Sequence, residues 1–232
     1  VVLIDIGGGT TDVAVFFDGI VRHTAVIPFG GNVITNDIKE GCSILLRQAE
    51  QLKVQFGSAL GDIAPEDKIV TIPGISGREP KEISFKSLAY IIQSRMEEII
   101  DYITFEVENS GYAEKLSAGI VLTGGGSLLK HIPQLVKFKT GYDVRIGYPN
   151  EHLTADSVED INSPTYSTAI GLVLKGFEQI DTSIRMNQTT NEDVNGSEKV
   201  QRIISKDVKK TNLIDRFKKR FTEIFEENDV EM

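Results

Sequence analysis

The residues best suited to chemistry stand near the start of the chain, in the stretch DIGGGTTD at residues 5–12. Three consecutive glycines separate two apolar runs that are typical of β-strands, and glycine weakens a strand because it adds no side chain to the packing. A turn of bare backbone is instead suited to a phosphate group, because successive N–H groups can converge on an anion. The predicted phosphate-binding residues are Gly7, Gly8, Gly9, Thr10 and Thr11.

Neither of the two common phosphate-binding fingerprints fits this stretch. A dinucleotide fingerprint that begins at Gly7 requires glycine at the position of Asp12, and the Gly-Lys-Ser/Thr of a Walker loop is absent here. Asp5 and Asp12 flank the turn, and two carboxylates beside a polyphosphate require a divalent cation between them. We therefore predict Mg²⁺ at Asp5 and Asp12, held partly through water. The alternative is a β-hairpin whose aspartates only cap the turn.

A second glycine turn, TGGGSLL at residues 123–129, follows another short apolar run. Its glycines place bare backbone where a ligand can approach, and a serine stands at the predicted start of a helix. Two glycine turns at the ends of separate strands indicate a cleft. The predicted ligand contacts from this second turn are Gly124, Gly125, Gly126 and Ser127.

The composition is that of an ordinary α/β protein. The chain has 232 residues, 40% hydrophobic and 25% charged, so it can bury one large core or two small ones. A net charge of −9 argues against a nucleic-acid binder, because phosphate backbones are held by clustered Lys and Arg. The single cysteine, Cys42, allows no internal disulfide, and no apolar run approaches the roughly 20 residues of a membrane-spanning helix. We expect a reducing, cytoplasmic compartment.

Periodicity and turn signals predict the elements that position these residues. Asp18-Gly19 is a strong hairpin signal, so the chain is expected to open with three antiparallel strands. The predicted strands cover residues 1–6, 11–17, 20–27, 68–72, 118–122 and 143–146. The predicted helices cover residues 32–40, 45–56, 84–109, 127 to about 138, and 165–177. The polar composition that begins near residue 181 is typical of a solvated linker.

These stretches resemble those of a known superfamily. DIGGGTTD resembles the second phosphate loop of the actin-like ATPases, and TGGGSLL resembles their adenosine motif. Within that superfamily, RHTAVIPFGGNVITNDI at residues 22–38, AEQLK at residues 49–53 and YSTAIGLVL at residues 166–174 resemble the bacterial FtsA family of cell-division proteins. The resemblance spans roughly residues 1–177, with its motifs in the family's order.

The resemblance implies an α/β fold, an actin-like (ribonuclease H-like) ATPase lobe with a small inserted subdomain and a C-terminal amphipathic helix. Subdomain IIA would comprise residues 1–55 and 117–177, and subdomain IIB residues 56–116. A flexible linker would cover residues 178–210 and a membrane-targeting helix residues 211–228.

The resemblance also implies ATP and Mg²⁺ as ligands. Glu50 and Lys53 would then lie over the ribose and base of the nucleotide, since residues three apart share a helix face; without the family context, such a pair is usually a solvated surface. Asp5 and Asp12 would stand near the metal and the attacking water. The first phosphate loop of this superfamily precedes the segments present here, so we expect weak or absent ATP binding by this chain alone. At most a slow ATPase is expected.

Two classes of function follow from the resemblance. The first is a scaffold that forms actin-like protofilaments and ties the tubulin-like division protein FtsZ to the inner face of the cytoplasmic membrane at the division site. The second is another actin-superfamily ATPase: a DnaK-type chaperone, a sugar kinase, or a scaffold of pilus assembly or rod shape. A chaperone would carry a long β-rich substrate domain after the ATPase lobes, where this chain has a polar stretch and one short helix.

A partner surface is predicted on the helix over residues 84–109. Its apolar residues lie on one side, which leaves Arg95 and Glu98 outside the core. By resemblance this helix belongs to the subdomain that receives the C-terminal peptide of FtsZ, although charges on a helix face usually serve only solvation.

The segment LIDRFKKRFTEIFEE at residues 213–227 predicts an amphipathic helix on a membrane surface. At about 100° per residue its apolar side chains fall within an arc of roughly 120°, and two basic residues flank the arc, where their stems can reach along the apolar face. The alternative is a stripe that packs on the protein itself or on a partner helix. The predicted membrane residues are Leu213, Ile214, Phe217, Lys218, Arg220, Phe221, Ile224 and Phe225.

Overall fold

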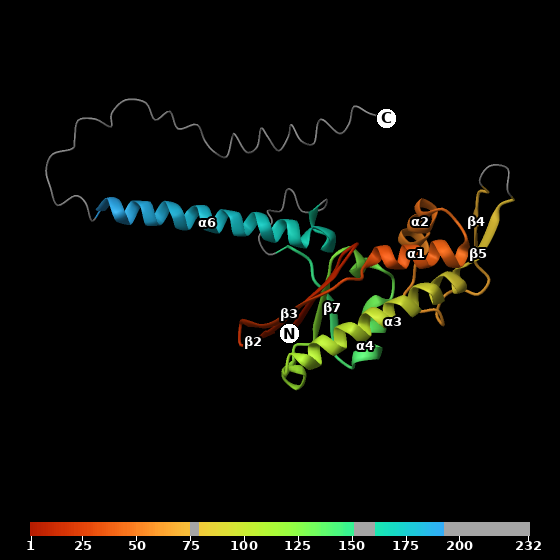
Figure 1. The fold of residues 1–232 in the computed structure, drawn as a ribbon, viewed down its shortest axis with the longest axis horizontal. Coiled ribbons are helices and arrows are strands. Elements are labelled where there is room, and N and C mark those ends of the chain that lie inside the picture. The colour runs from red at the N-terminus through yellow and green to blue at the C-terminus, as the bar shows by residue number, and fades with distance from the viewer. Residues whose placement is uncertain (75–78, 151–160, 193–232) are drawn as a thin grey trace, which may run out of the picture. The chain divides into compact units, whose positions relative to one another are not determined.

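Figure 1 shows the computed structural model, which describes residues 1–74, 79–150 and 161–192. The chain divides into two compact units, residues 1–177 and residues 178–232. The first unit contains both glycine turns. The predicted membrane helix lies outside the described residues.

A five-stranded mixed sheet forms the centre of the first unit, with the strand order β3-β2-β1-β6-β7. Its strands are β1 (Val2–Ile6), β2 (Thr11–Phe17), β3 (Ile20–Ile27), β6 (Ile120–Thr123) and β7 (Val144–Ile146). The first three strands are antiparallel neighbours, which confirms the predicted hairpins, whereas β6 runs parallel to β1 and to β7.

Burial alternates along β1 and β2, and this alternation decides which face carries the polar residues. Val2, Ile4 and Ile6 of β1 are fully buried on one face, beside Val13 and Val15 of β2. Burying each of these side chains stabilises the fold by roughly 1.5–3 kcal/mol. The aspartates of both strands point to the opposite face, because successive side chains alternate across a strand.

Helices pack beside the sheet and on one another. They are α1 (Gly31–Cys42), α2 (Leu46–Phe56), α3 (Phe85–Asn109) and α4 (Ile132–Thr140). Helix α3 packs against β2 and β3, and α4 against β7, whereas α1 packs on α2 and α3. The longest, α3, begins after Ser84, whose side chain accepts a hydrogen bond from the N–H of Ser87 and so caps the helix. Its buried side chains include Leu88, Ile92, Met96, Ile99 and Ile103, a spacing that gives one continuous apolar face. Figure 1 shows α1 and α3 running beside each other.

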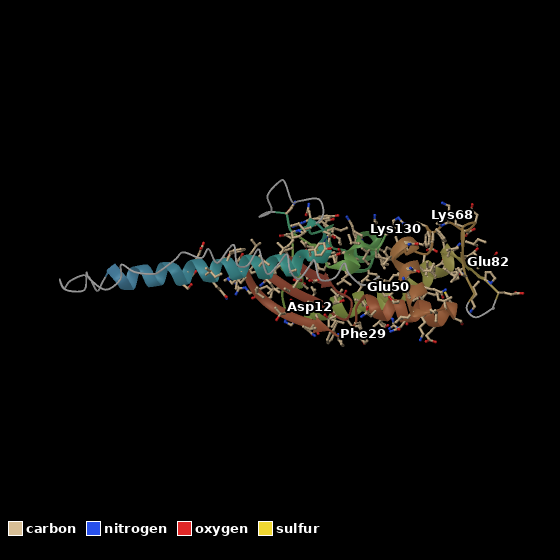
Figure 2. The ribbon with its side chains drawn as sticks, turned by 90° about the horizontal axis from the view of Figure 1, so that it is seen from above. Asp12, Phe29, Glu50, Lys68, Glu82 and Lys130 are labelled. Carbon is tan, nitrogen blue, oxygen red and sulfur yellow. The ribbon has the colours of Figure 1, made fainter. Side chains whose placement is uncertain are left out.

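A small hairpin projects at one end of the first unit. It consists of β4 (Ile69–Ile72) and β5 (Lys81–Ser84), which pair antiparallel. Figure 2 shows Lys68 and Glu82 at this hairpin, well away from Asp12. The sequence predicted the first of these strands but not the second, because KEIS carries two charged residues and only one buried apolar residue, Ile83.

Two boundaries differ from the sequence-based prediction. The second glycine turn leads into a short 3₁₀ helix, Gly125–Leu128, and α4 begins only at Ile132. Helix α6 (Ser167–Glu192) continues 15 residues past Phe177, so the prediction of a linker is wrong for residues 178–192. This segment contains neither Gly nor Pro, the residues that most often end a helix, although its polar composition resembles that of a linker.

Candidate functional site

The two glycine turns lie together at one edge of the sheet. β1 and β6 are parallel neighbours in the register Asp5 to Thr123, so their carboxyl ends meet at this edge. A Cβ atom on Gly124 would lie 2.6 Å from the Ile6 carbonyl oxygen, and Gly124 also has a φ of +78° that side chains rarely tolerate. A Cβ on Gly126 would lie 2.3 Å from the Ile6 side chain. Close contact with β1 therefore requires glycine at both positions.

The first turn presents free backbone amides. The N–H of Gly7 donates to the Thr10 carbonyl over 2.9 Å, which closes the turn. The N–H groups of Gly8, Gly9 and Thr10 donate to no other described residue, and these residues are exposed. A Cβ on Gly9 would meet nothing within 4 Å. Three exposed amides without an acceptor among the described residues are suited to an anion, and phosphate binding here stays a prediction.

Thr11 differs from the other predicted phosphate-binding residues. It begins β2 and is completely buried, and its hydroxyl donates to the Phe29 carbonyl over 2.8 Å. Its side chain therefore anchors the end of the turn within the protein.

The first turn rests on the start of α1. The N–H groups of Gly31 and Asn32 donate to the carbonyls of Gly7 and Gly8, over 2.9 and 2.7 Å. A Cβ on Gly30 would lie 2.6 Å from the Gly7 carbonyl oxygen, so a glycine is needed for this approach. Because the turn's carbonyls face α1, its free amides are left on the exposed side.

Asp5 and Asp12 face each other across β1 and β2. They are directly paired in the antiparallel register, so their side chains lie on the same face of the sheet. Asp12 accepts a hydrogen bond from the Thr10 hydroxyl at 3.2 Å, and Asp5 accepts one from the Thr168 hydroxyl at 2.6 Å. Among the described residues, no Lys or Arg forms an ion pair with either carboxylate. Like charges directly opposite each other are destabilising, and a divalent cation would relieve the repulsion.

The carboxylate pair also limits how a cation could be held. The part of the chain that the structure describes contains no group of three or more His, Cys, Asp or Glu side chains able to bind a metal. Two carboxylates leave most of the six positions around Mg²⁺ to water or phosphate oxygens. The donor set fits a magnesium ion that is bound together with a phosphate.

Of the ligand contacts predicted in the second turn, some are exposed and some are inside the protein. Gly125 is exposed and Gly126 half-buried. Ser127 is completely buried, and its hydroxyl donates to the Gly124 carbonyl over 2.7 Å. Ser127 therefore closes the turn from inside, and the helix expected to start there is a single 3₁₀ turn.

Glu50 and Lys53 form a tie between α2 and α1. The ammonium of Lys53 lies 2.8 Å from a Glu50 carboxylate oxygen and donates to the Gly31 carbonyl at 3.0 Å. Thr35 of α1 accepts a hydrogen bond from Lys53 and donates one to Glu50. Burial disfavours the charge on Glu50, but the hydrogen bonds from Lys53 and Thr35 and the Lys53 charge outweigh it, so the pKa of Glu50 lies below its ordinary value. Figure 2 labels Glu50 on α2.

Arg95 and Glu98 are less available than the sequence predicted. Arg95 forms a two-pronged ion pair with Asp37 of α1, with distances of 2.6 and 3.0 Å, and also contacts Glu98. Its side chain is 25% exposed, and that of Glu98 is 45% exposed. The ion pair between Arg95 and Asp37 thus joins α3 to α1. Of the two predicted partner-binding residues, Glu98 is the more accessible.

The histidines have internal partners where the structure describes them. His23 lies 3.0 Å from the Glu106 carboxylate, and His131 lies 3.0 Å from the Ser58 hydroxyl. His152 and the eight predicted membrane residues lie outside the described residues. Within residues 1–74, 79–150 and 161–192, no helix has the length and hydrophobicity needed to cross a membrane.

Sequence reasoning missed two residues that the geometry brings into prominence. Thr168 reaches Asp5 from 163 residues along the chain, and the only local signal is the pair of hydroxyl residues at the start of α6. Asp37 pairs with Arg95 across 58 residues, a contact that no spacing within one helix could reveal.

Comparison with known proteins places these features in a family. The family model described as cell division protein FtsA matches residues 2–171. The cell division protein FtsA of Pseudomonas aeruginosa is 35% identical over 187 residues, which cover 81% of this chain and 44% of that protein. The FtsA of Neisseria meningitidis is 41% identical over 174 residues, which cover 75% of this chain and 42% of that protein. The chain spans less than half the length of these curated relatives.

Solved structures of low sequence identity share the fold. MreB5 of Spiroplasma citri bound to ADP has a TM-score of 0.60 at 23% identity, covering 79% of this chain and 55% of that one. The MamK double helical filament has a TM-score of 0.55 at 17% identity, covering 74% of this chain and 53% of that one. The predicted actin-like α/β fold is confirmed, and since the FtsA model matches most of the residues, the chain belongs to the FtsA family of cell division proteins.

Proposed function

We propose that this chain supplies one side of an ATP–Mg²⁺ site in a cell-division scaffold, which ties FtsZ filaments to the cytoplasmic face of the membrane at the division site. The observation that carries the nucleotide part is the meeting of two glycine turns at the carboxyl ends of β1 and β6, beside the carboxylates of Asp5 and Asp12, which form no ion pair with any Lys or Arg that the structure describes. Ligands of α/β proteins bind outside the carboxyl ends of sheet strands. Membership of the FtsA family supports the part in cell division.

Each part of the site has a role in this proposal. The free amides of Gly8, Gly9 and Thr10 would bind phosphate oxygens, and the exposed backbone at Gly125 would lie against the nucleoside. Asp5 and Asp12 would hold Mg²⁺, partly through its waters, and the bound metal would neutralise phosphate charge. Glu50 is half exposed and pairs with Lys53, which bonds the start of α1 next to the first turn. Its carboxylate would contact the ribose.

ATP would act as a conformational ligand that is turned over slowly, if at all. Self-association into protofilaments fits the fold, because the similar MamK structure is a double helical filament. The C-terminal peptide of FtsZ would bind in the region of α3, and residues 211–228 would bind the membrane surface.

Gly9 gives the most direct test of the nucleotide site. Because a Cβ at Gly9 meets nothing within 4 Å and Gly9 has no positive φ, Gly9→Val is compatible with the fold. Its side chain would stand in front of the free amides. In the natural gene product that carries these residues, calorimetry should show Mg-ATP affinity reduced roughly 10- to 100-fold, the effect of losing one or two hydrogen bonds to a charged group.

Gly176→Val is the matched control. Gly176 lies on α6 about two helical turns beyond Thr168, and a Cβ there also meets nothing within 4 Å, so the same substitution is made away from the turns. This control should bind Mg-ATP as the wild type does. Unchanged affinity in Gly9→Val, or an equal loss in Gly176→Val, would reject the assignment of the first turn as the phosphate site.

A further inference from the structure

Two segments distant in sequence lie against the carboxylate of Asp5. Its Oδ2 accepts a hydrogen bond of 2.6 Å from the hydroxyl of Thr168, on the first turn of α6. Its Oδ1 occupies space that exists only because Gly124 has no side chain, since a Cβ on Gly124 would lie 2.1 Å from this oxygen. Oδ2 is therefore held by α6, and Oδ1 lies against the backbone of the second glycine turn.

The start of α6 is itself anchored to the end of β6. The hydroxyls of Thr123 and Ser167 lie 2.6 Å apart, and the N–H of Gly124 donates to the Pro164 carbonyl at 3.1 Å. These bonds place Thr168 independently of Asp5. The Thr168 hydroxyl thus approaches the carboxylate from a fixed support, and the bond to Asp5 can orient that carboxylate.

We propose that Thr168 is a positioning residue for magnesium binding, which fixes the orientation of the Asp5 carboxylate opposite Asp12. This inference rests on the proposed ATP–Mg²⁺ site. Asp5 has no Lys or Arg partner among the described residues, so the hydroxyl of Thr168 is the donor that sets its orientation. Groups that hydrogen-bond a metal ligand from behind orient it, and their removal typically weakens metal binding about 10- to 100-fold.

The test compares ATP binding with and without magnesium. In the natural gene product, calorimetry would give the ATP dissociation constant in excess Mg²⁺ and in EDTA, and the ratio of the two measures the gain from the metal. Thr168→Val keeps the side-chain shape but removes the donor, so the gain should fall at least about tenfold, with ATP binding in EDTA unchanged. Thr168→Ser keeps the hydroxyl and should retain the gain.

Two further variants separate positioning from a merely structural role. Thr182→Val makes the same substitution on α6 at a hydroxyl that donates only to the Glu178 carbonyl of its own helix, so the magnesium gain should be that of the wild type. In an Asp5→Asn background, Thr168→Val should cause no further loss, because the carboxylate on which it acts is gone.

The possible outcomes distinguish this inference from the function on which it rests. A wild-type gain retained in Thr168→Val, or an equal loss in Thr182→Val, would overturn the positioning role while leaving the ATP–Mg²⁺ site in place. An absence of any magnesium-dependent ATP binding by the wild type would reject the site, and the role of Thr168 with it. Thermal unfolding without ligand would show that the variants are folded.

Discussion

The carboxylate of Glu50 is half exposed on α2, yet its ionised form is bound by two donors, Lys53 and Thr35. These bonds hold its folded-state pKa below the ordinary value of about 4.3, although burial acts in the opposite direction. The ionised group therefore stabilises the fold above the unfolded-state pKa, and this contribution is lost as the pH falls through the lower folded-state pKa.

We accordingly predict that Glu50→Gln is less stable than the wild type at pH 7, and that the difference shrinks as the pH falls below about 4.3. The difference at pH 7 should not exceed about 1 kcal/mol, because solvent screens a half-exposed pair. Urea unfolding at several pH values measures it. Glu108→Gln, which removes an exposed carboxylate of α3, is the control and should show little change. A Glu50→Gln difference that stayed constant from pH 7 to pH 3 would contradict the tie to Lys53.

At the scale of elements, α1 joins three parts of the first unit. Its first amides bond the carbonyls of the first glycine turn, Thr35 and the Gly31 carbonyl bond Lys53 of α2, and Asp37 pairs with Arg95 of α3. One helix of 12 residues therefore contacts the proposed nucleotide site and the proposed partner helix. Along α1, the contact with α3 lies nearer the C-terminus of the helix than the contacts with the first glycine turn.

The ion pair between Asp37 and Arg95 complicates the predicted FtsZ contact. Arg95→Glu would place a carboxylate beside Asp37 and Glu98, so it should destabilise the fold as well as alter the surface. Asp37→Asn weakens the same link without changing Arg95 itself, and should reduce stability by about 1–2 kcal/mol in urea unfolding.

Fluorescence anisotropy with a labelled C-terminal peptide of FtsZ would then separate the two effects. If Arg95 contacts the peptide, Arg95→Glu should weaken binding markedly at a temperature where it remains folded, and Asp37→Asn should bind as the wild type does. Equal affinity of wild type and Arg95→Glu would exclude Arg95 as a contact. Equal losses in both variants would assign Arg95 to the structural link alone.

The sequence was sufficient for elements defined by local pattern. The strands around both glycine turns, the hairpin at Asp18-Gly19 and the long helix α3 follow from alternation, turn residues and helical periodicity. The two turns were also found, because runs of three glycines are hard to explain in any other way. The end of α6 was missed because helix and linker differ little in composition where a segment is polar and free of Gly and Pro.

The parts of the site that depend on tertiary contacts could not be predicted. Ser127 and Thr11 have the residue types of ligand contacts, but their hydroxyls are used inside the protein. Lys53 has the spacing of a surface pair, yet it donates to a backbone carbonyl of another helix. Each of these partners lies elsewhere in the chain or within the turn's own backbone, where residue spacing gives no signal.

At the scale of the whole molecule, charge is unevenly distributed. The chain carries a net charge of −9, but the segment from Lys206 to Arg220 holds seven Lys or Arg and only two Asp. Basic groups near an anionic leaflet contribute about 1 kcal/mol each to membrane binding. The basic cluster adjoins the predicted apolar stripe, so sequence supports a membrane-surface helix over residues 211–228, which lies outside the described residues.

We predict that this segment binds anionic vesicles reversibly, and that binding depends on its apolar stripe. Phe217→Glu or Phe221→Glu places a charge within the stripe and should strongly reduce the fraction that sediments with anionic liposomes, since burying a carboxylate in the membrane interface is unfavourable. Association of several copies should strengthen attachment, because each added copy binds at a high effective concentration.

Thr222→Glu is the matched control for this experiment. At about 100° per residue, Thr222 falls roughly 60° beyond the edge of the apolar arc, so the substitution adds the same charge to the segment without entering the stripe. If the helix binds by its apolar face, Thr222→Glu should lose only the small electrostatic share, whereas Phe217→Glu should lose most of the binding. Equal losses in both variants would indicate attraction by net charge alone. Unchanged sedimentation in Phe217→Glu and Phe221→Glu would mean that the stripe packs against protein, and the membrane anchor would have to be abandoned.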